Sequence, residues 1–251
     1  MRLDGVEVKV NLDGHQTAAA VKALGLPDVP TWSIFFVEDI MTRLGSSAPL
    51  LDHHLIIRAR QKTNGKDDVT VKFRPGRRSQ LAARWLAMAK STDGDLEAEL
   101  KVEQDWAGER RSLAISLTAE RPDGLLATAA NEGGVAALLT DDQHQLIDEC
   151  AEVRVNIDVL TMLPAVSAMR WPTFAAPGPD GSELKVRAER WAVSSLDFLE
   201  LSIAVGVDVA EAAQDALEAF VDSKGLQMTH GEAKTSQVMQ LLVEQGAKAT
   251  H

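Results

Sequence analysis

The sequence predicts an α+β fold in which a largely antiparallel sheet is accompanied by helices along the whole chain. Two observations support this prediction. Several segments alternate apolar with ionised side chains, which is the period of a half-buried strand. Other segments, between and after them, carry apolar residues at helical spacing. We therefore expect about eight to ten strands, with helices before, between and after them.

The composition is typical of an ordinary globular protein and restricts the kinds of partner. The chain has 251 residues, 45% hydrophobic and 25% charged, with a formal net charge of -11. Nucleic acid needs a basic surface, so we expect no nucleic-acid partner. The chain has no apolar run of membrane-spanning length, and its first residues lack a signal-peptide core, so we expect no membrane and a cytoplasmic location. The single cysteine, Cys150, excludes an internal disulfide and a cysteine-only zinc site.

The alternation begins near the start of the chain. Residues 3–12 predict a strand on which Glu7 and Lys9 share an ionic face, because every second residue of a strand points to the same side. Residues 14–24 have the spacing of a helix. Residues 31–38, rich in Trp and Phe, predict the next strand.

Residues 55–74 predict a hairpin of two strands joined by the polar turn 63–68. Alternate residues are apolar and the others are mainly basic, so the hairpin has one apolar and one cationic face. In most antiparallel sheets such a charged face is simply the solvated one. The cationic face carries Arg58, Arg60, Thr70, Lys72 and Arg74.

The second half of the chain continues the same mixture of elements. Its predicted helices span residues 77–89, most of 120–149, 209–224 and 232–244, and its predicted strands span residues 95–105, 153–159, 164–171, 183–191 and 196–205. Residues 108–118 fit a strand or a helix equally well.

The ionised residues are segregated by sign. Basic residues gather on the hairpin, whereas the strand at residues 95–105 carries Glu97, Glu99, Glu103 and Asp105. An open sheet with its ionic face in water is one interpretation. In the other, the sheet closes and its charged faces line an interior, where buried charge must be paired or bound to a ligand. Such an interior suits a polyphosphate anion held with divalent cations.

These motifs together resemble the CYTH superfamily, the triphosphate tunnel metalloenzymes. The resemblance covers essentially the whole chain, and it rests on the order and spacing of short strand motifs. They are Glu7-x-Lys9, Arg58-x-Arg60, Thr70-x-Lys72, Val102-Glu103, Arg170, Phe198-Leu-Glu-Leu-Ser202 and Glu232-Ala-Lys-Thr235.

The resemblance implies that residues 1–251 form a single domain, with a helical insertion around residues 120–150. It implies a closed antiparallel eight-stranded tunnel-like β-barrel with helices packed outside. It also implies a metal-dependent hydrolase of triphosphate-containing substrates, such as inorganic tripolyphosphate, thiamine triphosphate or a nucleoside triphosphate, with Mg²⁺ or Mn²⁺ as cofactor.

The candidate site residues fall into three groups. The predicted catalytic residues are Glu7 and Lys9. The predicted phosphate-binding residues are Arg58, Arg60, Lys72, Arg74, Arg170 and Lys234, since guanidinium and ammonium groups bind phosphate oxygens. The predicted metal ligands are Glu7, Glu103, Asp105, Glu189 and Glu200, since carboxylates bind hard cations.

The chain departs from the family pattern at three positions. Gly5 and Ser202 stand where the family usually has a carboxylate, and Ala168 where it usually has a basic residue. These departures keep one alternative open, a polyphosphate- or nucleotide-binding module with weak or no catalysis. A second alternative, which the resemblance itself implies, is an adenylate cyclase of the CYTH type. The oligomeric state is open.

Overall fold

The computed structural model describes residues 3–40, 48–63, 65–88, 91–93, 96–132, 134–229 and 233–249. Within these residues the strands are β1 (Gly5–Asp13), β2 (Thr31–Glu38), β3 (Leu55–Gln61), β4 (Asp67–Phe73), β5 (Ser91–Asp93), β6 (Leu96–Ala107), β7 (Arg110–Arg121), β8 (Thr161–Met162), β9 (Val166–Arg170), β10 (Phe174–Pro177), β11 (Glu183–Val193) and β12 (Leu196–Val205). The α-helices are α1 (Gln16–Ala23), α2 (Pro49–Asp52), α3 (Ala83–Ala87), α4 (Leu125–Glu132), α5 (Asp141–Cys150), α6 (Ala210–Ser223) and α7 (Lys234–Ala249).

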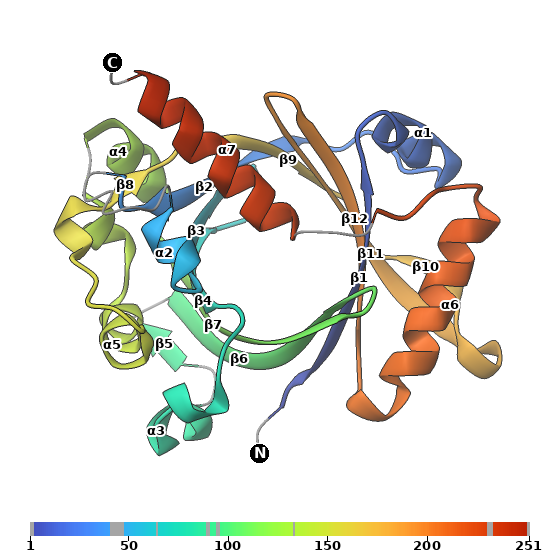
Figure 1. The fold of residues 1–251 in the computed structure, drawn as a ribbon, viewed down its shortest axis with the longest axis horizontal. Coiled ribbons are helices and arrows are strands. Elements are labelled where there is room, and N and C mark those ends of the chain that lie inside the picture. Colours follow the sequence, from blue (N-terminus) through green and yellow to red (C-terminus); the bar gives the residue numbers. More distant parts are fainter. Residues whose placement is uncertain are drawn as a thin grey trace.

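The strands form a closed barrel, as the ring of ribbons in Figure 1 shows. Around the barrel their order is β1-β12-β11-β9-β2-β3-β4-β7-β6, and β6 pairs with β1 to close it. The closed α+β barrel is therefore confirmed, but the described strands in it number nine and not the expected eight.

One pair of neighbours in the barrel is parallel, which corrects the expected all-antiparallel arrangement. The pair is β1 with β6, whereas the other neighbours around the described barrel are antiparallel. Strand directions that alternate around a closed ring require an even number of strands. With nine strands, one parallel pair is unavoidable, and it forms the closing seam.

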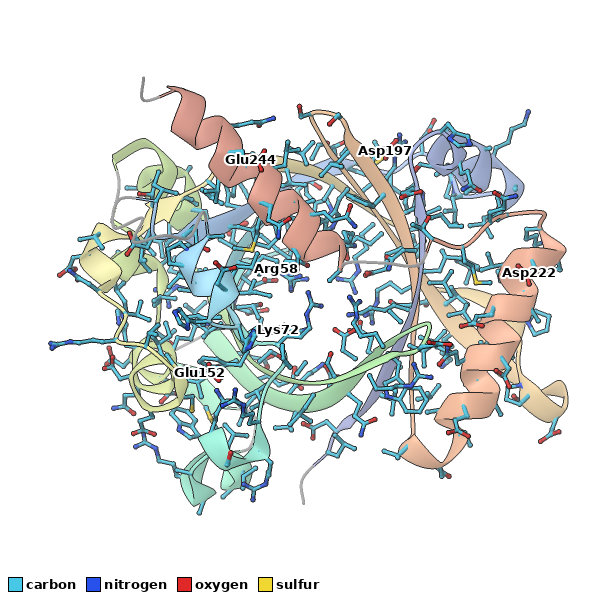
Figure 2. All side chains as sticks on the ribbon, viewed as in Figure 1. Arg58, Lys72, Glu152, Asp197, Asp222 and Glu244 are labelled. Carbon is cyan, nitrogen blue, oxygen red and sulfur yellow. The ribbon has the colours of Figure 1, made fainter. Side chains whose placement is uncertain are left out.

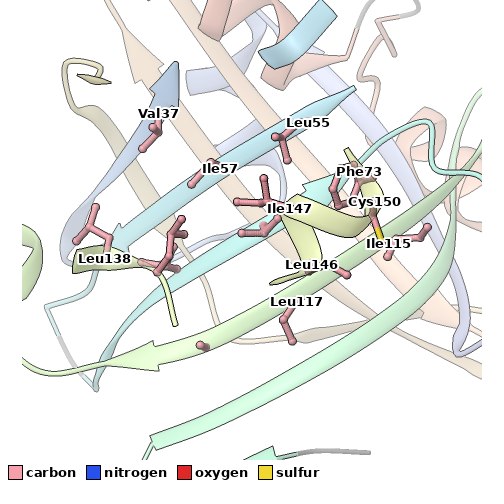
Figure 3. Packing of buried hydrophobic residues seen from close by; sticks show 14 of the residues in the cluster. Val37, Leu55, Ile57, Phe73, Ile115, Leu117, Leu138, Leu146, Ile147 and Cys150 are labelled. Carbon is pink, nitrogen blue, oxygen red and sulfur yellow. The ribbon is translucent and has the colours of Figure 1, made fainter. Parts of the chain in front are cut away.

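Helices cover the outside of the barrel and bury its outward apolar residues. Behind β3, β4 and β7, α5 places Leu146 and Ile147 against Ile57 and Leu117 (Figure 3). On the opposite side, α6 packs through Leu217 and neighbouring residues onto the outer face of β1, β11 and β12. No described helix is long and apolar enough to cross a membrane.

Helix α7 has a different position, across one mouth of the barrel (Figure 1). Its residues Val238 and Leu242 pack in one apolar cluster with Phe36, Ile56 and Trp191. These last three side chains also line a cavity inside the barrel. The helix therefore packs on the inner wall of the barrel and covers that end.

The strand expected at residues 153–159 is absent, which corrects that prediction. The segment is irregular and ends in a short 3₁₀ turn, Ile157–Val159. Val155 and Ile157 are half-buried and pack against the apolar cluster outside the barrel, which explains their alternation without a strand partner. The side chain of Asn156 accepts a hydrogen bond from the Asp158 backbone at 3.3 Å, a local bond that favours the turn.

Candidate functional site

A polar cavity of about 180 Å³ lies inside the barrel, and we call it the central cavity. In the all-atom view Arg58 and Lys72 point into the barrel opening (Figure 2). The described lining includes eight cationic side chains and four carboxylates, so cations are in excess. The cationic ones are Lys9, Arg58, Arg60, Lys72, Arg74, Arg170, Arg187 and Lys234, and the carboxylates are Glu7, Glu103, Glu189 and Glu200.

The alternation of the strands positions these side chains. On β3, Arg58 and Arg60 point inward, while Ile57 and Ala59 enter the apolar cluster outside the barrel. Arg58 stands directly opposite Thr70 of β4, so the two strands of the hairpin present one continuous polar surface. Neighbouring strands repeat the arrangement, and the inward faces therefore surround the cavity with charge.

Asp105 lies beneath the cavity and holds three cations together. Its Oδ2 is 2.8 Å from Lys9 Nζ, 3.0 Å from Arg74 and 3.5 Å from Lys72. Burial alone would raise the pKa of Asp105, but the charges of Lys9, Lys72 and Arg74 hold it well below its usual range. With 2% of its surface exposed, Asp105 serves as a buried counter-ion for these bases.

Glu7 and Lys9 form an ion pair at the same place. Lys9 Nζ lies 2.8 Å from the Glu7 carboxylate. Burial opposes ionisation of Glu7, but Lys9 and Lys72 outweigh it and lower its pKa to about 2. Burial likewise opposes the charge of Lys9, yet Asp105 and Glu7 raise its pKa above the usual value. Both predicted catalytic residues are therefore fully ionised at neutral pH.

Two carboxylates face each other across β11 and β12, and one lysine lies beside them. Glu189 is the register partner of Glu200, and like charges in this position repel. Lys234, at the start of α7, places its Nζ 3.3 Å from Glu200 and 4.0 Å from the centroid of the Trp191 ring. Burial would raise the pKa of Glu189, but Lys234 and Arg58 keep it below its ordinary value. Trp191 Nε1 also donates a hydrogen bond to Glu189.

Arg58 and Arg60 differ in how they are held. Arg60 makes a bidentate pair with Asp68, with N–O distances of 2.6 and 2.7 Å. Arg58 makes no hydrogen bond or ion pair within the described chain, and its Nε is buried without a partner. Burial, together with the nearby charge of Arg60, lowers the pKa of Arg58 to about 10. Arg58 is thus a half-buried cation that faces the cavity and is not paired with a carboxylate of the described chain.

Lys72 and Glu103 are two further groups whose ionisation the cavity disfavours. Burial, followed by the charges of Lys9 and Arg74, lowers the pKa of Lys72 to about 8. Burial and the charge of Glu7 raise the pKa of Glu103. Among the described residues Glu103 has no hydrogen-bond or ion-pair partner, unlike the other carboxylates at the cavity.

The predicted metal ligands do not form a ready-made metal centre. No group of three or more His, Cys, Asp or Glu side chains in the described chain is arranged to bind one ion. Four of the five predicted carboxylates are engaged by lysine, arginine or tryptophan, and only Glu103 is free within the described chain. Mg²⁺ in phosphate sites commonly uses one or two carboxylates and takes its other ligands from phosphate and water. Glu103, beside Glu7, fits that lesser role.

The structure brings the predicted site residues together. Eleven of the twelve line the central cavity, and the twelfth, Asp105, lies directly beneath it. Arg170 is exposed at its edge, and Glu232 lies outside the described residues. Their chemical roles remain predictions.

The sequence does not identify all of the residues that line the central cavity. Arg187 lines the cavity from the strand that carries Glu189, where its alternation with apolar residues makes it a possible site residue without assigning it a role. Ser116 and Thr118 come from β7, in the stretch whose periodicity fits a strand or a helix. Phe36 and Ile56 also belong to the lining, and both pack in one apolar cluster with residues of α7.

Comparisons with known proteins show that the fold of this chain is similar to that of several solved structures. No family model matches the chain, and no curated protein matches it in sequence. One similar solved structure is a candidate adenylate cyclase from Bacillus halodurans, with 10% identity, a TM-score of 0.56, and 94% of this chain and 97% of that chain covered. Another is a candidate adenylyl cyclase from Hippeastrum with a dominant triphosphatase activity, with 13% identity, a TM-score of 0.58, and 94% and 95% covered.

Both likenesses extend over nearly the whole length of the chain, so the chain shares the fold of these two structures. At these identities the comparison describes the architecture. The chemistry must be argued from the residues of this chain.

Proposed function

We propose that this protein binds the triphosphate group of a small molecule in the central cavity and hydrolyses it in the presence of a divalent cation. Three features support binding. The cavity lies inside the barrel, its lining carries excess positive charge, and several of its cations are held in place by buried counter-ions. Arginine and lysine in such a setting recognise phosphate oxygens.

The single observation that carries the proposal is the state of Arg58. The Nε of Arg58 is buried without a hydrogen-bond partner, which is costly, and burial lowers the pKa of this half-buried side chain. An anion in the cavity removes that cost by supplying the missing acceptor. A linear triphosphate has enough negative charge to satisfy Arg58 and Arg187, both of which have a buried Nε without a partner.

Hydrolysis requires charge stabilisation and an oriented water. We propose that Arg58, Arg60 and Lys72 stabilise the charge of the departing diphosphate. Glu7, ionised and fixed by Lys9, orients a water molecule toward the terminal phosphorus. A divalent cation carried in with the phosphate chain, beside Glu103 and Glu7, would neutralise phosphate charge.

The test is phosphate release from tripolyphosphate, thiamine triphosphate and ATP, with and without Mg²⁺ or Mn²⁺. The variant R58A/R60A should lose activity by about a hundredfold or more. Lys62 still contacts Asp68 at 2.7 Å in that variant, so the carboxylate is not stranded. R77A is the matched control, because Arg77 is exposed and pairs with Glu152 outside the cavity. Retained activity and binding in R58A/R60A would refute the proposal, and cyclic AMP among the products from ATP would identify a cyclase.

A further inference from the structure

Glu189 differs from its neighbours at the central cavity, because the group that holds it is neutral. Glu7 and Glu200 each pair with a lysine, at 2.8 and 3.3 Å. Glu189 makes no ion pair within the described chain and instead accepts a hydrogen bond from Trp191 Nε1. Both Glu189 and Trp191 line the cavity, so this bond lies within the proposed phosphate site.

The indole of Trp191 anchors the carboxylate. Only 2% of the surface of Trp191 is exposed, so its N–H group needs an acceptor inside the protein. The ring itself is fixed, because it packs against Phe36 with 5.7 Å between the ring centroids and joins the apolar cluster of α7. If Glu189 moved toward a cation, it would leave a buried donor without a partner, which is costly.

This anchoring bears on Arg58, which lines the same cavity and has no partner within the described chain. Burial raises the pKa of Glu189, but the charges of Lys234 and Arg58 outweigh it, so Arg58 and Glu189 attract each other. An ion pair between them would occupy the guanidinium that a phosphate oxygen needs. The two groups nevertheless stay apart, with the carboxylate on the indole.

A second tryptophan in the chain shows the same contacts with a different result. Trp85 Nε1 donates to Glu149 at 2.8 Å, and the Arg84 guanidinium lies 4.8 Å from the centroid of the Trp85 ring. There the cation also pairs with the carboxylate. A tryptophan hydrogen bond therefore does not by itself prevent an ion pair. What matters at Trp191 is where the carboxylate is held.

We infer that Trp191 is a positioning residue of the phosphate site: its N–H group holds Glu189 apart from Arg58 and so leaves Arg58 free for the phosphate chain. This inference rests on the proposed function. Without the N–H group, Glu189 is released to pair with Arg58 and competes with the phosphate oxygens for it. Trp191 thus acts on the anion through Glu189, without touching it.

The experiment measures tripolyphosphate affinity by calorimetry, without divalent metal, in a cycle that combines W191F with E189Q. W191F removes the N–H donor and keeps an aromatic ring. While Glu189 is present, W191F should weaken binding about tenfold. In the E189Q background no carboxylate is released, so W191F should change the affinity by less than about twofold. W85F is the matched control, because Trp85 makes the same contacts outside the barrel, and it should bind as the native protein does.

A second replacement tests the donor alone, and it serves if W191F does not fold. The amino acid 3-benzothienylalanine has the shape of tryptophan, with sulfur in place of the N–H group. At position 191 it should weaken tripolyphosphate binding as W191F does, and again only while Glu189 is present.

The possible outcomes separate the inference from the proposed function. Equal losses on W191F with Glu189 and with E189Q would mean that Trp191 acts through packing, and would overturn the inference alone. Unchanged affinity in W191F or in the benzothienyl variant would also overturn it, as would an equal loss in W85F. If the native protein binds no tripolyphosphate, the proposed function itself fails, and the inference fails with it.

Discussion

Glu103 on β6 lies directly opposite Gly5 on β1, in the parallel pair that closes the barrel. Gly5 is the first of the three positions at which the sequence departs from the superfamily pattern it resembles, which usually has a carboxylate there. Its φ is +150°, and a Cβ built there would lie 2.9 Å from the carbonyl oxygen of Val205. The backbone at this seam therefore excludes a side chain at position 5, and the neighbouring strand provides a carboxylate beside it.

Replacing Gly5 should destabilise the barrel. G5A adds both an unfavourable φ and a contact with the Val205 carbonyl, so we expect a loss of about 2 kcal/mol or more in the free energy of unfolding. G124A is the matched control, because Gly124 also has a positive φ, +83°, but open space around its Cβ. Urea unfolding would compare the two variants, and equal losses would show that the close approach to Val205 has no effect.

The Glu103 carboxylate should weaken tripolyphosphate binding when no divalent cation is present and support it when one is present. E103Q removes a negative charge that faces the bound anion, so tripolyphosphate should bind about tenfold more tightly without metal. If Glu103 helps to bind the metal–phosphate complex, Mg²⁺ should strengthen binding in the native protein and much less in E103Q. E99Q is the control on the same strand, since Glu99 pairs with Lys101 and does not line the central cavity. Identical responses to Mg²⁺ in E103Q and the native protein would exclude Glu103 from metal binding.

The hairpin shows how far local sequence can predict the site. Alternation in residues 55–74 predicts β3, β4 and the face that carries Arg58 and Lys72, because the two-residue period is set by strand geometry alone. The strand at residues 31–38 is predicted to its exact ends. The same rule fails at residues 153–159. Apolar residues alternate there because they pack against the apolar cluster outside the barrel, although the segment is not a strand.

The closure of the barrel is not encoded locally. The β1–β6 pair joins residues as far apart as Gly5 and Glu103, and no turn connects them. Sequence alternation therefore cannot reveal the parallel seam, although it marks the strands that form it. The pairing of charges is equally non-local, because Asp105 binds Lys9, Lys72 and Arg74 from two other strands and the loop after β4. A carboxylate of this kind can be assigned to a metal or to a counter-ion only once its neighbours are known.

Lys72 should make anion binding depend on pH. Its pKa is about 8, so the lysine loses its charge as pH rises through that value and the affinity for tripolyphosphate should fall. Binding should also take up a proton near pH 8 to 9, because the anion restores the charge. Calorimetry in buffers of different ionisation enthalpy measures this uptake, which should vanish in K72Q and persist in K101Q. Uptake that is unchanged in K72Q would assign the proton to another group.

The lowered pKa of Lys72 should also make the free energy of unfolding depend on pH. The folded-state pKa of Lys72 is below the ordinary lysine value of 10.5, so between about pH 8 and 10.5 the unfolded chain binds more protons than the folded one. The contribution of Lys72 to the free energy of unfolding should therefore increase with pH across this window. Urea unfolding at several pH values should show a smaller increase for K72Q than for the native protein, whereas equal slopes would contradict the shifted pKa.

Lys234 should stabilise the covered end of the barrel through Glu200. K234M leaves Glu189 and Glu200 opposite each other without the adjacent ammonium group, so we expect a loss of about 3 kcal/mol in the free energy of unfolding. K224M is the control, because Lys224 also lies over an aromatic ring, at 5.3 Å from Phe220, but is exposed.

A double-mutant cycle separates the charge effect from packing. Adding E200Q to K234M removes the repulsion with Glu189 and should recover part of the lost stability, giving a coupling energy of about 1 kcal/mol or more. Additive effects would mean that Lys234 acts only through its contact with Trp191, 4.0 Å from the ring centroid. Coupling would establish that the start of α7 is held by charges within the cavity, so that a bound triphosphate, which competes for Lys234, weakens the contact between α7 and the barrel.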